Sequence, residues 1–214
     1  MKILITAGPT REAIDPVRFI SNRSSGRMGY ALAAAFLRRE DQVLLISGPT
    51  TIDIPDHADF IPVESADDMY RAVEKAINDC DIAIFCAAVA DYTIAQPEPQ
   101  KIKKDAETFT LQLTKTKDIL GSARDPLNFS GTLVGFAAET QDVELYAKSK
   151  RSKKKCDLII ANDVSREGTG FDSTENEVLI ISEFETIKLP RQSKENLGHI
   201  LAEIIADYHR ARQE

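Results

Sequence analysis

Short apolar runs that alternate with helical segments constrain the fold of this 214-residue chain more than any other feature. The runs cover residues 3–5, 43–46, 82–86, 133–136 and 158–160. Apolar runs of this length, without alternating polar residues, are typical of strands that are buried on both faces. Strands that alternate with helices form right-handed crossovers, so we expect one α/β domain over residues 1–214, with a mainly parallel sheet flanked by helices.

The segments between the runs predict the helices. We expect them over residues 26–39, 65–77, 143–155 and 193–210. Met69, Val73 and Ile77 recur at helical spacing after Ser65, which is a typical N-cap residue.

Three further segments predict strands of other kinds. Residues 59–63 contain Pro62, which favours an edge strand because proline cannot donate to a ladder. Residues 109–113 alternate apolar and polar side chains, which predicts a strand with two different faces. Residues 178–181 and 186–189 predict a C-terminal hairpin, which the last helix follows.

The connection after the first strand, from Ala7 to Gly29, is longer than the roughly two to six residues that join most strands to helices. Ligands of open α/β sheets bind beyond the carboxyl ends of the strands, so this length predicts a functional loop. Residues 24–29, which include Ser25 and Gly26, could form an anion cradle at a helix start, or only a cap with close helix packing. Asn22 could donate to an oxyanion, or could close an Asx-turn.

A second candidate segment follows the strand at residues 82–86. Ala87 and Ala88 have small side chains, which let a ligand approach the backbone. Asp91 could bind ribose hydroxyls or a magnesium-bound water, or it could cap a helix.

Two lysine-rich segments stand out in an acidic chain. Lys101 and Lys103 follow a proline-broken loop and share one face of an extended segment, where they could meet a phosphate or face solvent. Six of the eight residues from 148 to 155 are Lys or Arg. Lys150 and Lys154 lie one helical turn apart, so they could bind a polyphosphate together or only favour the helix dipole.

Composition excludes several classes of function. A net charge of −7 argues against general nucleic-acid binding. No apolar run reaches the ~20 residues of a membrane span, so we expect a cytoplasmic protein. The three cysteines and three histidines show no metal-ligand spacing, so we expect free thiols and no structural metal site.

An α/β fold of this class is also compatible with two other functions. An NAD(P)-dependent reductase would need a glycine-rich fingerprint after the first strand, which is absent, and Tyr92 has Gln96 instead of lysine four residues on. A non-catalytic nucleotide-binding module would not need Asn22 and Lys101 together.

Seven segments in one order resemble a single family. They are residues 5–12, 15–18, 20–29, 87–92, 101–104, 135–140 and 162–164. Nearly the whole chain is similar to the bacterial phosphopantothenate–cysteine ligases (phosphopantothenoylcysteine synthetases) of coenzyme A biosynthesis. The resemblance implies a Rossmann-like fold with an extended flap, and a homodimer with a shared active site. It also implies CTP-dependent ligation of 4′-phosphopantothenate and L-cysteine through an acyl-cytidylate, with Mg²⁺ accompanying the triphosphate and pyrophosphate and CMP released.

The resemblance also implies residue roles. Asn22 would bind the acyl group and support amide formation, Lys101 would be the catalytic flap lysine, and Arg18 would reach the phosphate in the neighbouring subunit. The expected nucleotide-binding residues are Ala87, Asp91, Lys101, Asp118, Ile119, Phe136, Lys150 and Lys154. The expected phosphopantothenate-binding residues are Arg18, Asn22, Ser25, Gly26, Ala87, Ala88 and Asp91.

Two features depart from this family pattern. Many bacterial relatives carry the unit behind a flavin-dependent decarboxylase, whereas this chain begins at the ligase. We therefore expect the decarboxylase to be a separate protein, or the chain to be an excised domain. Lys117 stands where relatives often have proline, next to Asp118 and Ile119.

Overall fold

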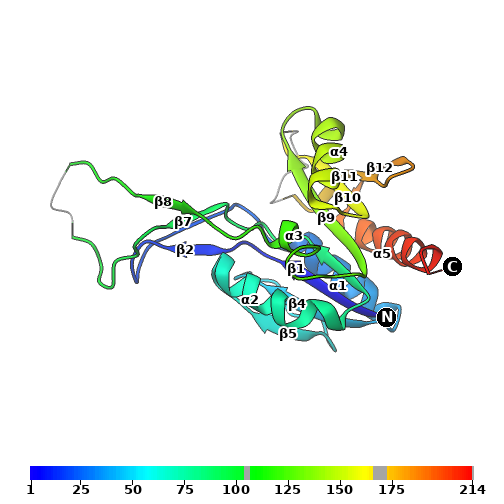
Figure 1. Cartoon of the computed structure of the whole chain (residues 1–214), viewed down its shortest axis with the longest axis horizontal. Coiled ribbons are helices and arrows are strands. Elements are labelled where there is room, and N and C mark those ends of the chain that lie inside the picture. The colour runs from blue at the N-terminus through cyan, green and yellow to red at the C-terminus, as the bar shows by residue number, and fades with distance from the viewer. Residues whose placement is uncertain (104–106, 166–172, 214) are drawn as a thin grey trace.

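An eight-stranded sheet forms the body of the chain in the computed structural model, which describes residues 1–103, 107–165 and 173–213 (Figure 1). Its strands are β1 (Lys2–Ala7), β4 (Gln42–Ser47), β5 (Asp59–Pro62), β6 (Ile82–Phe85), β9 (Thr132–Glu139), β10 (Leu158–Asp163), β11 (Glu175–Ile181) and β12 (Thr186–Ser193). The spatial order is β12-β11-β10-β9-β6-β1-β4-β5. The strands from β5 to β10 run parallel, and β11 and β12 continue antiparallel, which confirms a mainly parallel sheet.

Helices cover both faces of the sheet. They are α1 (Arg27–Arg38), α2 (Ala66–Ala76), α3 (Ile119–Ser122), α4 (Val143–Lys154) and α5 (Lys194–Ala211), with a short 3-10 helix, η1 (Ile77–Asp79), after α2. Leu32 of α1 and Leu201 of α5 join one buried cluster, and Met69 of α2 and Ala147 of α4 join the other. Leu4 of β1 belongs to the second cluster and its two neighbours to the first, because strand side chains alternate between faces. Among the helices of the described residues, none is long and apolar enough to cross a membrane.

Most of the predicted elements are confirmed. All five apolar runs form parallel strands of the sheet, except that Cys86 follows the end of β6, and β5, which contains Pro62, is an edge strand. Ser65 caps α2 in a reciprocal capping box: its hydroxyl accepts from the Asp68 N–H at 3.1 Å, and the Asp68 carboxylate accepts from the Ser65 N–H at 3.0 Å. The C-terminal hairpin is confirmed as β11 and β12, and it extends the main sheet beyond β10.

Two short strand pairs form an arm that projects from the body (Figure 1). β2 (Arg11–Ala13) pairs antiparallel with β3 (Phe19–Ser21), and β7 (Tyr92–Ile94) pairs antiparallel with β8 (Leu113–Lys115). The arm comprises residues 11–21 and the described residues of 92–115. The β2–β3 hairpin lies within the long loop after β1, so that loop contains regular structure that sequence reasoning did not predict.

Of the strand predicted over residues 109–113, only Leu113 lies in a strand of the structure, where it is the first residue of β8. Its partner β7 has only three residues, and the ladder that forms β8 begins at Leu113. Phe109 is 59% exposed and Leu113 is 45% exposed, so the described residues provide no layer against which an apolar face could pack.

Sheet order brings two loops together at the carboxyl edge. β4 lies on one side of β1 and β6 on the other, which makes the gap between β1 and β6 a topological switch point. The Ala88 N–H donates to the Gly8 carbonyl at 2.9 Å, and the Thr10 N–H donates to the Ala88 carbonyl at 3.3 Å. The loop after β1 is therefore joined to the loop after β6 where a ligand is expected.

Candidate functional site

Two cavities meet at the carboxyl ends of the central strands. The basic pocket has a volume of about 600 Å³, and its lysines are Lys115, Lys117, Lys150 and Lys154. The loop pocket has a volume of about 330 Å³ and is lined by Asn22, residues 24–29, Ala88, Asn162, Asn176 and Lys194, among others. Both cavities are lined by Ala87, Val89, Asp91, Phe136 and Lys150, so ligands in the two pockets would touch at these residues.

Lys150 and Lys154 point to the basic pocket from the same face of α4, as their spacing predicted. The Lys150 ammonium donates to the Phe136 carbonyl at 2.8 Å, and burial lowers its pKa. Lys154 forms an ion pair with Asp118. Burial opposes ionisation of Asp118, but this ion pair and the N–H of Gly121 keep its pKa below the usual value. The pocket thus holds preformed positive charge at its α4 wall.

Asn22 connects the two loops of the loop pocket. Its side-chain amide donates to the Ala88 carbonyl at 2.9 Å, across the crevice, and not to its own turn. An Asx-turn is closed by the side-chain oxygen of Asn22, so this N–H donation does not test that interpretation, which stays a prediction. This bond leaves the Asn22 side chain at the pocket wall, in contact with the loop after β6.

At the start of α1, glycines allow the helix to pack closely on its neighbours, as one of the two interpretations of residues 24–29 predicts. Gly26 is the N-cap with φ of 80°, a left-handed conformation that favours glycine, and no side chain of the described residues caps the helix. A Cβ on Gly29 would lie 2.6 Å from the Cβ of Ala7, so glycine permits the close approach of α1 to β1. Ser25 and Gly26 line the loop pocket, and their use as an anion cradle stays a prediction.

Asp91 lines both pockets. The interpretation of this residue as a helix cap is wrong, because β7 follows it instead of a helix. Its main-chain carbonyl accepts from the Thr116 N–H at 3.0 Å, which fixes the base of the arm beside the basic pocket.

The family model described as the DNA/pantothenate metabolism flavoprotein C-terminal domain matches residues 1–208. The chain belongs to this family. A relative named Coenzyme A biosynthesis bifunctional protein CoaBC, from Vibrio vulnificus (strain YJ016), is 50% identical over 198 residues. That match covers 92% of this chain and 49% of the relative, so the chain spans about half the length of the relative.

Two solved structures share this fold. The crystal structure of the C-terminal domain of a CoaBC protein is 39% identical, with a TM-score of 0.80 over 96% of this chain and 94% of the other. A Cab2 mutant in complex with phosphopantothenate-cysteine is 17% identical, with a TM-score of 0.75 over 97% of this chain and 86% of the other. The predicted Rossmann-like α/β fold is confirmed.

Lys117 attaches one wall of the basic pocket to α2. Its ammonium lies 3.0 Å from the Asp67 carboxylate and 4.4 Å from the centre of the Tyr70 ring. Asp118 follows and caps α3 by accepting from the Gly121 N–H at 2.9 Å. Ile119, the first residue of α3, lines the same pocket. Side-chain contacts that a proline lacks therefore hold this segment.

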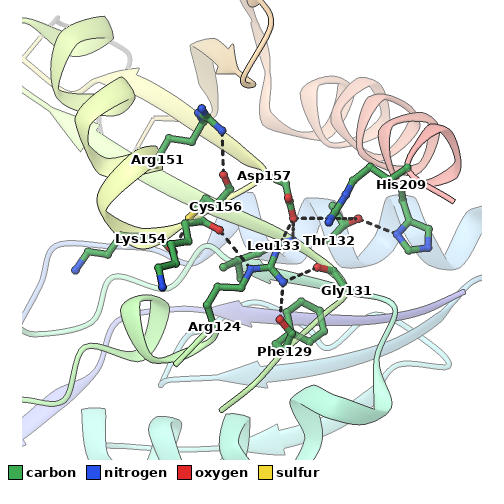
Figure 2. Close-up of polar contacts among 12 residues, drawn as sticks. Arg124, Phe129, Gly131, Thr132, Leu133, Arg151, Lys154, Cys156, Asp157 and His209 are labelled. Carbon is green, nitrogen blue, oxygen red and sulfur yellow. Dashed lines mark hydrogen bonds and ion pairs between the residues drawn. The ribbon is translucent and has the colours of Figure 1, made fainter. Parts of the chain in front are cut away.

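Arg124 ties the segment after α3 to the end of α4 (Figure 2). Its guanidinium donates to the carbonyl of Lys155, the C-cap residue of α4, at 3.3 Å, and to the Phe129 and Gly131 carbonyls at 2.5 and 2.9 Å. It also forms an ion pair with Asp157 at 2.6 Å. The segments that carry Asp118 and Lys154 are thus connected at a second point, in addition to the ion pair between these two residues.

Arg18 and Lys101 line neither pocket of their own chain. Arg18 forms an ion pair with Asp15, which holds the pKa of that carboxyl well below its usual range. Arg18 also donates to the Ile102 carbonyl at 3.2 Å, and the Ile102 N–H donates to Asp15 at 3.1 Å. The flap beside the exposed Lys101 is therefore attached to the β2–β3 hairpin, and Lys104 lies outside the described residues.

Sequence reasoning assigned no role to three polar residues of the loop pocket, Asn162, Asn176 and Lys194. Lys194 is the first residue of α5, yet only 7% of it is exposed. A cation at this end of a helix opposes the helix dipole, which favours anions there. That mismatch was readable in the sequence once a helix was expected from residue 193.

Proposed function

We propose that this chain ligates 4′-phosphopantothenate to L-cysteine, with CTP as the activating nucleotide, as a step of coenzyme A biosynthesis in the cytoplasm. One observation carries the proposal: the basic pocket and the loop pocket join at Asp91, Phe136 and Lys150. A triphosphate in the first pocket and a carboxylate in the second would meet there. Membership of a family whose relatives are named as coenzyme A biosynthesis proteins supports it.

The first step would take place at the junction. A carboxylate oxygen of phosphopantothenate attacks the α-phosphorus of CTP and forms the acyl-cytidylate. The bond from the α-phosphorus to the bridging oxygen breaks, and pyrophosphate leaves with the electron pair. Lys150 and Lys154 would stabilise the charge that develops on the leaving group, because preorganised cations in a partly dry pocket act strongly.

Magnesium would enter with the triphosphate. No group of three His, Cys, Asp or Glu side chains that could hold a metal is found within residues 1–103, 107–165 and 173–213. Mg²⁺ usually keeps its waters and binds substrate phosphates with one or two carboxylates. The donor set fits that mode: Asp91 and Asp118 line the basic pocket and could hold the ion, which would neutralise phosphate charge.

The second step would form the amide. The cysteine amine attacks the acyl carbon and the C–N bond forms, while the amine loses a proton to solvent. The bond from the acyl carbon to the phosphate oxygen breaks, and CMP leaves with the electron pair. Asn22 would donate its side-chain amide to the carbonyl oxygen as negative charge develops there. Its position at the wall of the loop pocket supports this role.

A pyrophosphate-release assay tests the proposed function. We expect release from CTP and 4′-phosphopantothenate, with amide product only when cysteine is added. Absence of release with every nucleoside triphosphate would contradict the proposal. Competition between CTP and ATP would decide the nucleotide.

We further propose a homodimer in which the arm completes the site of the neighbouring subunit. Arg18 and Lys101 lie on the arm, outside both pockets of their own chain. The arm also exposes apolar side chains: Phe19 is 47% exposed, Tyr92 is 48% exposed and Leu113 is 45% exposed. These features support burial of the arm against a second copy. A phosphopantothenoylcysteine decarboxylase, on a separate protein or a fused domain, would consume the product.

Mixed dimers test the shared site. A 1:1 mixture of Asn22→Asp and Arg18→Ala chains, refolded together, should recover roughly a quarter of wild-type activity, since half of the dimers are mixed and each has one intact site. The activity measured is amide formation, which neither variant alone should support at more than a small fraction of the wild-type rate. A mixture of Asn22→Asp with Lys150→Met is the control, because both defects lie in the chain's own pockets and leave no intact site. Failure of the first mixture to recover activity would contradict a shared site.

The Arg124 contacts predict an effect on nucleotide binding. We expect Arg124→Met to raise KM for CTP roughly tenfold, because loss of positioning contacts remote from the chemistry can cost up to about 100-fold. KM for cysteine should stay unchanged. Arg212→Met is the matched control: Arg212 also pairs with Asp157, at 2.7 Å, but no contact of Arg212 with α4 is found among the described residues. An equal rise of KM for CTP in both variants would show a purely structural role.

A further inference from the structure

Two buried carboxylates lie in the β2–β3 hairpin of the arm, and neither step above uses them. Glu12 is 3% exposed and Asp15 is 4% exposed, although most described residues of the arm are exposed. Both lie outside the basic pocket and the loop pocket of their own chain. A carboxylate is rarely buried unless hydrogen bonds replace its hydration, so the partners of these two side chains show what each one holds.

Glu12 attaches the arm to the start of α2. Its carboxylate accepts from the N–H of Ala66, the first residue of α2, at 2.9 Å. The helix dipole favours a negative charge at this end of a helix. One residue earlier in β2, the Arg11 N–H donates to the Glu64 carbonyl at 2.8 Å. Two adjacent residues of β2 thus fix the root of the arm on the body of the protein.

Asp15 attaches the remainder of the arm to this root. Its carboxylate accepts from the N–H groups of Val17 and Arg18, at 2.8 and 2.9 Å, and pairs with the Arg18 guanidinium. It also accepts from the N–H of Ile102, the neighbour of Lys101, at 3.1 Å. One side chain therefore sets the position of Arg18 relative to the flap.

The use of charged groups at these two places favours a role in geometry. Hydrogen bonds to an ionised carboxylate are short and directional. Burial of a charge costs hydration, so apolar side chains of similar size could stabilise the fold equally well. What the carboxylates add is a defined arrangement of body, hairpin and flap. A displacement of about 1 Å that arises far from the chemistry can lower a rate about 100-fold.

We propose that Glu12 and Asp15 are positioning residues for the active site of the neighbouring subunit, because they hold Arg18 and Lys101 of the arm in place for it. This inference rests on the proposed ligation and on the proposed shared site. The two carboxylates of one chain therefore determine the rate at the pockets of its partner, and not at the pockets of their own chain.

Mixed dimers test this role. Amide formation by Glu12→Ala alone and by Asp15→Ala alone should fall roughly 30-fold. Refolded 1:1 with Asn22→Asp, each should recover roughly a quarter of wild-type activity, because its own pockets then receive an intact arm. Refolded with Arg18→Ala, neither should recover activity, because that mixture contains no intact arm. A defect in the chain's own pockets would give the opposite result in both mixtures.

Two further variants separate positioning from stability. Ser65→Ala removes a hydrogen bond at the same start of α2 that does not involve the arm, so it and Glu12→Ala should both lower Tm by roughly 3 °C. Only Glu12→Ala should lose activity. Glu12→Gln keeps an oxygen that can accept from Ala66 and should retain most of the rate. Asp15 lies on the arm, away from the core, so its variant tests the proposal even if Glu12→Ala does not fold.

Three results would overturn the positioning role: recovery with Arg18→Ala, no recovery with Asn22→Asp, or an equal loss of rate in Ser65→Ala. The underlying proposals fail in other ways. No pyrophosphate release by the wild-type protein would overturn the ligation. No recovery in the mixture of Asn22→Asp with Arg18→Ala would overturn the shared site.

Discussion

Asn22→Asp should release pyrophosphate from CTP and phosphopantothenate at close to the wild-type rate, yet form amide roughly 100- to 1,000-fold more slowly. The substitution keeps the size of the side chain but replaces an N–H donor with a negative charge. That charge would repel the oxyanion that forms on the acyl carbonyl in the second step, whereas the first step develops its charge at the phosphates. Rapid-quench detection of the acyl-cytidylate should show the intermediate accumulating in the variant.

Ser21→Ala is the matched control for Asn22. The Ser21 hydroxyl donates to the Thr10 carbonyl at 2.7 Å, so its loss also weakens the loop, but Ser21 does not line the loop pocket. Amide formation in Ser21→Ala should stay near the wild-type rate. Normal turnover of Asn22→Asp would show that Asn22 has no role at the acyl carbonyl.

Lys101→Gln should slow the first step, with pyrophosphate release falling roughly 100-fold in single-turnover assays. The reason is the loss of one cation that would offset charge on the departing pyrophosphate. The structure sharpens this prediction, because Lys101 is exposed on the arm and lines neither pocket of its own chain. Lys101 could therefore act in the first step only if the arm reached the active site of another subunit, as it would in the proposed dimer.

Lys103→Gln tests whether the rate of the first step depends on the position of Lys101 or only on the amount of positive charge in this segment. Lys103 is exposed two residues further along the same segment, so the variant loses the same charge from the same region. It should keep a rate within about threefold of wild type, as a surface charge usually contributes little. Equal losses in both variants would indicate a general electrostatic effect, and no loss in Lys101→Gln would make the flap lysine an ordinary solvated side chain.

The parallel sheet and its flanking helices were predictable because their signals are local. A continuous apolar run such as residues 82–86 is stable only when both faces of the strand are buried. Pro62 restricts its strand to an edge of the sheet. The spacing of Lys150 and Lys154 determined that both face one pocket, since residues four apart share a helix face. Family resemblance added roles for these residues, which the assays above must test.

The arm could not be predicted in the same way. Its strands have three residues each, too few for a periodic signal, and Phe109 and Leu113 are exposed although their alternation suggested a covered face. Alternation of apolar residues indicates that one face of a strand will be buried. It does not indicate whether the same chain or a second chain covers that face. The same limit explains why Arg18 and Lys101 resemble site residues and yet lie away from the pockets of their own chain.

The sequence by itself determined most strands and helices of the main body of this protein, because hydrophobic periodicity and capping act between residues close in the chain. Only the tertiary structure decided that Asp91, Phe136 and Lys150 form the junction of two pockets, and that Lys194 lines one of them. Asp91 follows β6, and Phe136 lies in β9. Lys150 lies in α4, and Lys194 is the first residue of α5. Their meeting depends on strand order, which is set by the packing of the whole sheet and carries no local signal.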